Sequence, residues 1–85
     1  KLVNMWVGHY DYNTLDQNAI LGPHPDVENL IFANGFSGHG LQQAPALGRG
    51  LAEWITFGSY QTLDLTQFSV ERVLSGKKFL EKAVI

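Results

Sequence analysis

A glycine-rich loop is the part of this sequence best suited to chemistry. Three of the seven residues from 34 to 40 (NGFSGHG) are glycines, which let a ligand approach the backbone closely. An apolar helical pattern follows, and the first N–H groups of a helix lack intrahelical partners and carry partial positive charge. The loop therefore predicts a site for an anion or an electron-rich ligand. The alternative is a tight turn that needs glycine only for its shape, since the spacing is neither a dinucleotide fingerprint nor a P-loop.

A helix is expected directly after this loop. Apolar residues recur every three or four positions, at Leu41, Ala44, Leu47, Leu51, Trp54 and Ile55. This spacing predicts a helix over about 41–57, and Gly58 is suited to end it. Pro45 cannot donate a helical hydrogen bond, so the regular helix is expected to begin near residue 44. Gly48 and Gly50 weaken a helix, and their presence predicts close packing against its backbone.

Short strands are expected before the loop. Residues 2–12 (LVNMWVGHYDY) are rich in aromatic and β-branched types, which favour an extended strand. Residues 24–29 have the composition of a tight turn. The apolar run 30–33 (LIFA) predicts a short strand buried on both faces, as in a parallel sheet. The predicted order is strands within about 2–33, the loop at 34–40, the helix at about 41–57 and a tail over 59–85, in which Ser69 begins a short helical turn.

Composition excludes several classes of function. The 85 residues make at most one small domain, with 45% hydrophobic and 16% charged residues and a net charge of −2. Basic residues are not clustered, so no nucleic-acid partner is expected. No apolar run is long enough for a membrane-spanning helix. Because the chain has no cysteine, it can form neither disulfides nor thiolate metal sites. The three histidines, His9, His24 and His39, lack the paired spacing of metal ligands, so no metal site is predicted. The chain begins with Lys1, and we expect it to be a piece of a longer protein.

The remaining polar and aromatic side chains have ordinary interpretations. Asp11 and Asp16 lie near turn residues, where a solvated or capping role is expected. His39 is interpreted as a residue that supports the loop rather than as a general base. Trp6 and Trp54 are expected in the core.

The loop and its surroundings resemble a known family. GFSGHG after a short apolar strand is similar to the C-terminal flavin loop of the sarcosine-oxidase-like branch of the D-amino-acid oxidase superfamily. The upstream run HPDVENLIFANG and the later positions Leu63, Asp64, Phe68 and Ser69 match as well, so the similarity covers about residues 5–75. The runs YDYNTLDQNAILGPHP and GFSGHGLQQAPALGR resemble a mitochondrial branch implicated in the assembly of respiratory complex I.

This resemblance implies an α+β fold and a role in binding FAD. Residues 1–85 would be a C-terminal piece of an FAD-binding Rossmann-like domain together with antiparallel substrate-domain strands. The segment would close the isoalloxazine site of FAD, with backbone N–H groups around 38–41 facing the pyrimidine end of the ring. The cofactor-binding residues implied are Gly35, Phe36, Ser37, Gly38, His39, Gly40, Leu41 and Gln42. The implied activity is hydride transfer from an amine-like or other C–H donor to flavin, with the substrate and the catalytic residues unidentified. The alternative is a non-catalytic assembly factor for complex I with a structural flavin.

Departures from the family pattern limit what is carried over. Relatives that oxidise amines place a substrate-binding lysine where this chain has Gln42. Several relatives attach flavin through a cysteine at about His9 or Tyr10, and without cysteine FAD should be held non-covalently. Tyr10 and Tyr12 would share one strand face, and the resemblance makes them, with Gln42, candidates for the substrate pocket.

The partners follow from the same resemblance. The N-terminal remainder of the parent flavoprotein would be required for FAD binding, because the chain lacks the fingerprint for the ADP part. Complex I assembly intermediates and a mitochondrial location are further implications of the resemblance.

Overall fold

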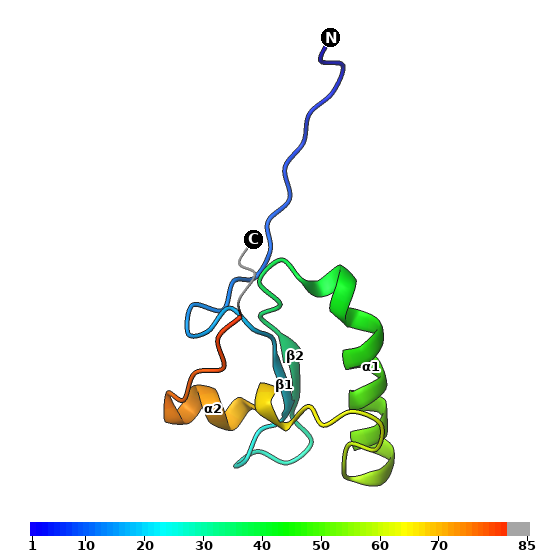
Figure 1. Cartoon of the computed structure of the whole chain (residues 1–85), viewed down its shortest axis with the longest axis vertical. Helices are drawn as coiled ribbons and strands as arrows, with labels where there is room; N and C mark the ends of the chain where they lie inside the picture. Colours follow the sequence, from blue (N-terminus) through cyan, green and yellow to red (C-terminus); the bar gives the residue numbers. More distant parts are fainter. Residues whose placement is uncertain (82–85) are drawn as a thin grey trace.

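The chain folds as a long helix and a short helix on either side of a small hairpin. The computed structural model describes residues 1–81. In chain order the elements are β1 (Ile20–Pro23), β2 (Ile31–Asn34), α1 (Gly40–Phe57), the 3₁₀ helix η1 (Thr66–Phe68) and α2 (Val70–Ser75). Figure 1 shows α1 and α2 flanking the hairpin, with the N-terminal segment extending away from the folded part. The prediction of an α+β fold with one main helix is confirmed.

The two strands form an antiparallel hairpin. The register pairs Ile20 with Asn34 and Pro23 with Ile31. The backbone N–H of His24 donates to the carbonyl of Leu30 at 2.9 Å and closes the predicted turn. The predicted strand at 30–33 therefore exists one residue later, but the prediction that it is buried in a parallel sheet is wrong. Three of the four residues of β2 are exposed, because it pairs only with β1 and no described element covers its outer face.

The main helix matches its predicted range. Helix α1 ends at Gly58, whose φ of 76° is left-handed and whose N–H donates to the carbonyl of Trp54 at 2.8 Å. The helix begins at Gly40, so the expectation of a regular start near residue 44 is wrong, and Pro45 lies inside the helix. The hydrogen bond that Pro45 cannot donate would go to the carbonyl of Leu41. Leu41 is an exposed residue in the first turn, where water can replace that bond.

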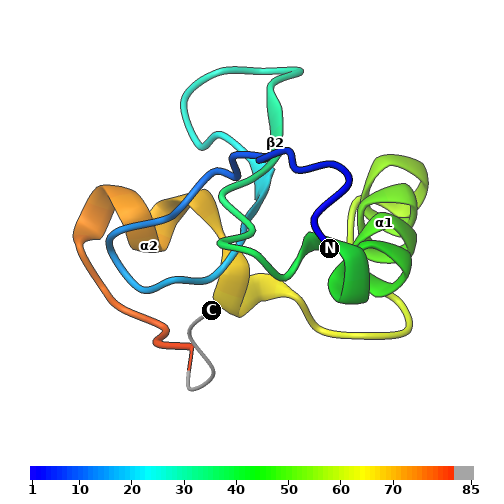
Figure 2. The ribbon, with the colours of Figure 1, turned by 90° about the horizontal axis from the view of Figure 1, so that it is seen from above.

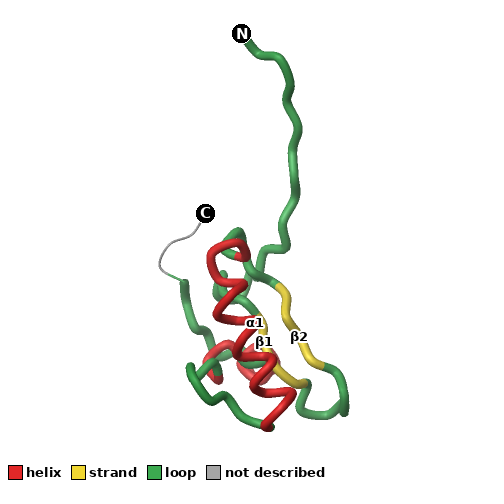
Figure 3. The backbone as a smooth tube through the Cα atoms, turned by 90° about the vertical axis from the view of Figure 1, so that its right-hand side faces the viewer, coloured by secondary structure: helices red, strands yellow, loops and turns green. Residues whose placement is uncertain are grey.

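A small apolar core joins α1 to the hairpin. The buried members of the core are Ala19, Leu21, Leu47 and Leu65, and partly buried Phe36, Leu51, Tyr60 and Phe68 pack around them. Helix α1 runs beside β1 (Figure 3), which brings Leu47 to the strand. A Cβ at Gly50 would lie 2.2 Å from Cδ1 of Leu65, so close packing is confirmed there. At Gly48 nothing described lies within 4 Å of the added carbon, and the same prediction is wrong.

The N-terminal segment is not a strand in this structure. All residues from 1 to 10 are exposed, and the predicted strand over 2–12 makes no ladder with any described residue. The segment leads away from the folded part in Figure 1, so in the view from above in Figure 2 it lies in front of that part. Trp6 is 83% exposed, so the core position expected for it is wrong. A strand is stabilised by a neighbouring strand, and neither of the two described strands pairs with residues 1–10. Trp54 is partly buried against Tyr60, with ring centroids 5.5 Å apart.

The tail carries the predicted short helix. Ser69 precedes α2, and Gly76 ends it with a φ of 75°. Within the described residues, no helix is both long and apolar enough to cross a membrane.

Candidate functional site

The loop between β2 and α1 has an unusual backbone conformation. Gly35, Ser37 and Gly38 all have positive φ, at 69°, 54° and 88°. Glycine adopts such angles without a steric cost, but serine does so rarely. The N–H of His39 donates to the carbonyl of Phe36 at 3.0 Å, which turns the chain into the first residue of α1. The loop therefore presents successive peptide groups in one tight turn at the helix N-terminus.

Residues from the end of the N-terminal segment hold this loop in place. The N–H of Ser37 donates to the carbonyl of Asp11 at 2.9 Å, and the N–H of Asn13 donates to Oγ of Ser37 at 2.8 Å. The N–H of Gly35 donates to the carboxylate of Asp11. Ser37 is almost fully buried, and its hydroxyl also donates to the carbonyl of Gly35 at 3.2 Å. We call these contacts of Asp11 and Asn13 with Gly35 and Ser37 the loop clamp.

The helix N-terminus that follows the loop has neither a side-chain cap hydrogen bond nor an acidic residue in its first turn. His39 occupies the N-cap position and makes no side-chain cap hydrogen bond, and the first turn contains no acidic residue. The first N–H groups of α1, those of Gly40, Leu41 and Gln42, have no intrahelical acceptor by geometry. Leu41 is 91% exposed and Gln42 is also exposed. The positive end of the helix dipole therefore faces outward, beside the loop, where an electron-rich group can be stabilised.

The residues predicted for the site fall into two groups. Gly35 to Gln42 form one continuous loop and first helix turn, as the sequence predicted. Tyr10 and Tyr12 flank Asp11, so the loop clamp brings their backbone next to the loop, and their side chains are 52% and 44% exposed. Sequence reasoning missed the role of Asp11 and Asn13. Turn-type composition was the only local signal, and it does not reveal a partner 24 residues away.

Asp16 corrects a prediction. The expectation that it is solvated is wrong, because its side chain is 0% exposed and pairs with Arg72 at 2.6 Å between Oδ2 and Nε. The alternative expectation, that it caps a turn, is confirmed, since its Oδ1 accepts a hydrogen bond from the N–H of Asn18 at 3.3 Å. Its carboxylate also accepts hydrogen bonds from the N–H of Phe79 at 2.9 Å and from Nδ2 of Asn13 at 2.9 Å. Burial by itself would raise the pKa of Asp16, but the hydrogen bonds from Arg72 and Phe79 outweigh it and lower the pKa. Asp16 is therefore an ionised, buried group.

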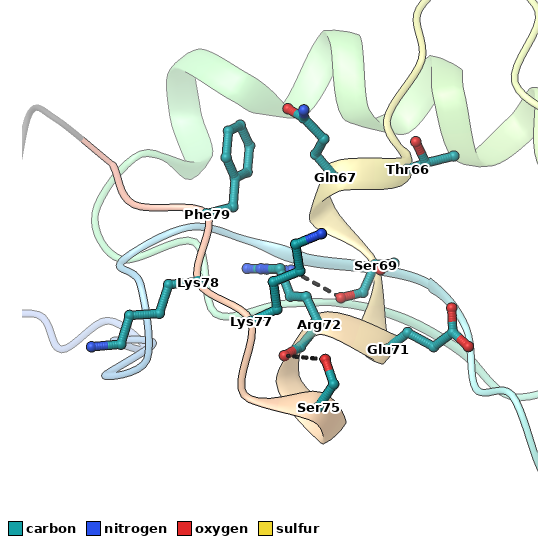
Figure 4. A pocket seen from close by; sticks show the side chains of 9 residues that line it. All are labelled: Thr66, Gln67, Ser69, Glu71, Arg72, Ser75, Lys77, Lys78 and Phe79. Carbon is teal, nitrogen blue, oxygen red and sulfur yellow. Dashed lines mark hydrogen bonds between the residues drawn. The ribbon is translucent and has the colours of Figure 1, made fainter.

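Two cavities of the described chain lie away from the loop. A cavity of 450 Å³ lies between α2 and the tail (Figure 4), and one of 320 Å³ lies near Trp54 and Tyr60. In Figure 4 the side chains of Gln67 and Lys78 point in different directions. Neither cavity is lined by any residue from 35 to 42. Among residues 1–81, no group of three His, Asp or Glu side chains could hold a metal ion.

Comparison with known proteins identifies the family. Residues 1–54 match the family described as FAD dependent oxidoreductase. The chain belongs to this family. FAD-dependent oxidoreductase domain-containing protein 1 of Bos taurus is 52% identical over 85 residues, which are 100% of this chain and 18% of that protein. Its Drosophila melanogaster homolog is 44% identical over 81 residues, 95% of this chain and 16% of that protein. No solved structure matches the chain significantly.

A second group of relatives has a substrate in its name. Peroxisomal sarcosine oxidase of Homo sapiens is 39% identical over 69 residues, 80% of this chain and 17% of that enzyme. The chain thus spans less than a fifth of the length of these relatives. The match to the family includes the loop, the loop clamp and nearly all of α1.

Proposed function

We propose that this chain forms the part of an FAD site that faces the isoalloxazine ring, in a longer FAD-dependent oxidoreductase. One observation carries the proposal: the loop clamp delivers three positive-φ residues to the start of a helix whose first turn is exposed and contains no acidic side chain. Family membership supports FAD as the ligand of this junction. The cofactor-binding residues proposed are Gly35, Phe36, Ser37, Gly38, His39, Gly40, Leu41 and Gln42.

The residues of the chain would act by binding and by electrostatics. FAD, when bound, supplies the hydride acceptor. The N–H groups near Gly38 to Leu41 would donate to the pyrimidine edge of the ring, where negative charge gathers on reduction, and the helix dipole would add to that stabilisation. Asp11 and Ser37 would keep these donors in place without touching the cofactor through their side chains. The preorganised N–H groups need no rearrangement when the charge develops.

FAD would be bound without a covalent link to this segment. The chain contains no cysteine, and the first turn of α1 is exposed at Leu41 and Gln42. The remainder of the longer protein would enclose the ring and bind the ADP part. Exposed apolar residues, including Leu2, Met5, Trp6, Leu41 and Ile55, would be buried against that remainder.

The donor would be an amine-like or other C–H compound. The likeness to sarcosine oxidases favours a C–N donor. Gln42 supplies a neutral amide in the exposed first turn of α1, so a substrate carboxylate would be held less strongly than by a cation. Tyr10 and Tyr12 are the proposed lining of the pocket, because they flank the residue that contacts the loop.

A second candidate function is a non-catalytic role with a structural flavin, in mitochondrial assembly of respiratory complex I. The neutral Gln42 at the exposed start of α1 favours this function, because no positively charged side chain stands at that position to bind a substrate carboxylate. The partners would then be complex I assembly intermediates.

One experiment separates these functions. The full-length protein is purified and divided into two samples. One sample is precipitated with acid to release its flavin, and the other is mixed anaerobically, as the holoprotein, with a series of N-methyl amines and amino acids. We expect intact FAD in the supernatant and bleaching of the flavin by at least one donor. Bound FAD that no donor bleaches would favour the structural flavin, and a protein purified without FAD would refute both functions.

A further inference from the structure

We infer that the buried Asp16–Arg72 pair positions the flavin loop, acting through Asn13 and Ser37. This inference rests on the proposed function, because it assigns a role to Asp16, Arg72 and Asn13, which hold the proposed cofactor loop but are not among the proposed cofactor-binding residues. The pair joins residues 56 positions apart in the sequence and is not part of the loop.

The pair is a fully satisfied buried unit. Nε and NH2 of Arg72 donate to the two carboxylate oxygens of Asp16 at 2.6 Å and 3.0 Å, and the two side chains are 5% and 0% exposed. The same guanidinium donates to the carbonyls of Asn18 at 3.0 Å and Ala19 at 2.8 Å, just before β1. A two-pronged contact of this kind fixes direction as well as distance. The segment from Asp16 to Ala19 is therefore fastened to α2 in one orientation.

A short series of hydrogen bonds connects this unit to the loop. Nδ2 of Asn13 donates to Oδ1 of Asp16 at 2.9 Å and to the carbonyl of Asn18 at 2.7 Å. The backbone N–H of Asn13 donates to Oγ of Ser37 at 2.8 Å. Asn13 is 9% exposed and Ser37 is 1% exposed, so water does not compete readily for these bonds. Arg72, Asp16, Asn13 and Ser37 thus form one continuous buried path from α2 to the flavin loop.

The loop needs such support because its conformation is not the default of its residues. Ser37 has a φ of 54°, which an isolated serine rarely adopts, between glycines with φ of 69° and 88°. A conformation of this kind persists only when its surroundings fix it. Loss of the contact to Asn13 would let Ser37 relax and would turn the neighbouring N–H groups away from the proposed ring position. The pair therefore affects the direction of the cofactor donors, beyond its effect on stability.

The experiment uses the full-length flavoprotein with Arg72→Lys and Asn13→Ala. Arg72→Lys keeps the charge but loses the two-pronged contact. Asn13→Ala leaves the Asp16–Arg72 pair intact but removes the side-chain hydrogen bonds of residue 13 to Asp16, to the carbonyl of Asn18 and from the N–H of Leu15. Its backbone N–H still donates to Ser37, so the variant tests whether the Asn13 side chain holds that N–H in position. Leu65→Ala is the matched control, because Leu65 is buried in the core against Gly50 and has no contact in the path. The measurements are the melting temperature, the dissociation constant of FAD, the flavin absorption spectrum and the flavin reduction potential.

We expect both path variants to bind FAD about tenfold more weakly, with a shifted spectrum and a lower reduction potential. Leu65→Ala is expected to lower the melting temperature while the spectrum and potential stay at wild-type values. Wild-type spectrum and potential in the path variants would overturn the inference, whatever their melting temperatures. If Arg72→Lys gives no soluble protein, Asn13→Ala decides. A wild-type protein without FAD would instead overturn the proposed function, and the inference with it.

Discussion

Two glycines at opposite ends of α1 allow the cofactor role of the loop to be separated from its effect on stability. Gly38 has a φ of 88° just before the helix, and Gly58 has a φ of 76° just after it. An alanine in the left-handed region costs roughly 1–2 kcal/mol at either position. At Gly58 nothing described lies within 4 Å of the added carbon, so its cost is conformational alone. From this conformational cost, Gly38→Ala and Gly58→Ala should each destabilise the full-length protein by roughly 1–2 kcal/mol.

Only Gly38→Ala should weaken FAD binding. Turning one loop N–H away from the ring removes a hydrogen bond that contributes about 1 kcal/mol, which corresponds to a dissociation constant about fivefold higher. The assay is titration of the apoprotein of each variant with FAD, followed by flavin fluorescence, together with thermal melting of both variants. Equal loss of affinity in the two variants would show that FAD binding follows stability. Unchanged affinity in Gly38→Ala, despite its lowered melting temperature, would remove the loop from the cofactor site.

The other predictions concern the helix, its C-terminal turn and the substrate. Gly48→Ala should raise stability by up to about 1 kcal/mol. Gly50→Ala has the same gain in helix propensity but places a carbon 2.2 Å from Cδ1 of Leu65. Overpacking of about 1–3 kcal/mol should therefore make Gly50→Ala less stable than Gly48→Ala. Equal melting temperatures of the two variants would refute this packing. Hydrogen bonds from the side chain and N–H of Thr62 and from a neighbouring N–H lower the pKa of Glu53 from 4.5 to about 2. Because folding lowers that pKa, ionised Glu53 should contribute to the free energy of unfolding above pH 4.5, and this contribution should be lost as the pH falls toward 2. The melting temperature of Glu53→Gln should therefore depend less on pH between 4.5 and 2 than that of the wild type. Melting temperatures of the two proteins that change in parallel with pH would contradict this. Gln42→Lys should bind a small carboxylate about tenfold more tightly, seen by titration of the flavin spectrum, and an unchanged curve with a lower melting temperature would contradict a pocket position for Gln42.

Local patterns were sufficient where neighbours in sequence supply the interaction. The main helix and its end at Gly58 followed from apolar spacing and a left-handed C-cap, because both depend on contacts within a few residues. The start of α2 after Ser69 followed for the same reason. The expectation for Pro45 failed because a single lost hydrogen bond in an exposed first turn does not stop a helix that is packed elsewhere.

The sequence by itself determined the α+β class, the glycine-rich loop and the helix that follows it. The loop was recognisable because glycine spacing and helix periodicity are local properties of the chain. Tertiary structure alone decided the environment of Asp16, since its partners Arg72 and Phe79 lie 56 and 63 residues away and no short-range pattern encodes that pairing. It also decided that the N-terminal segment stays exposed in this chain, because a strand becomes stable only when a neighbouring strand pairs with it.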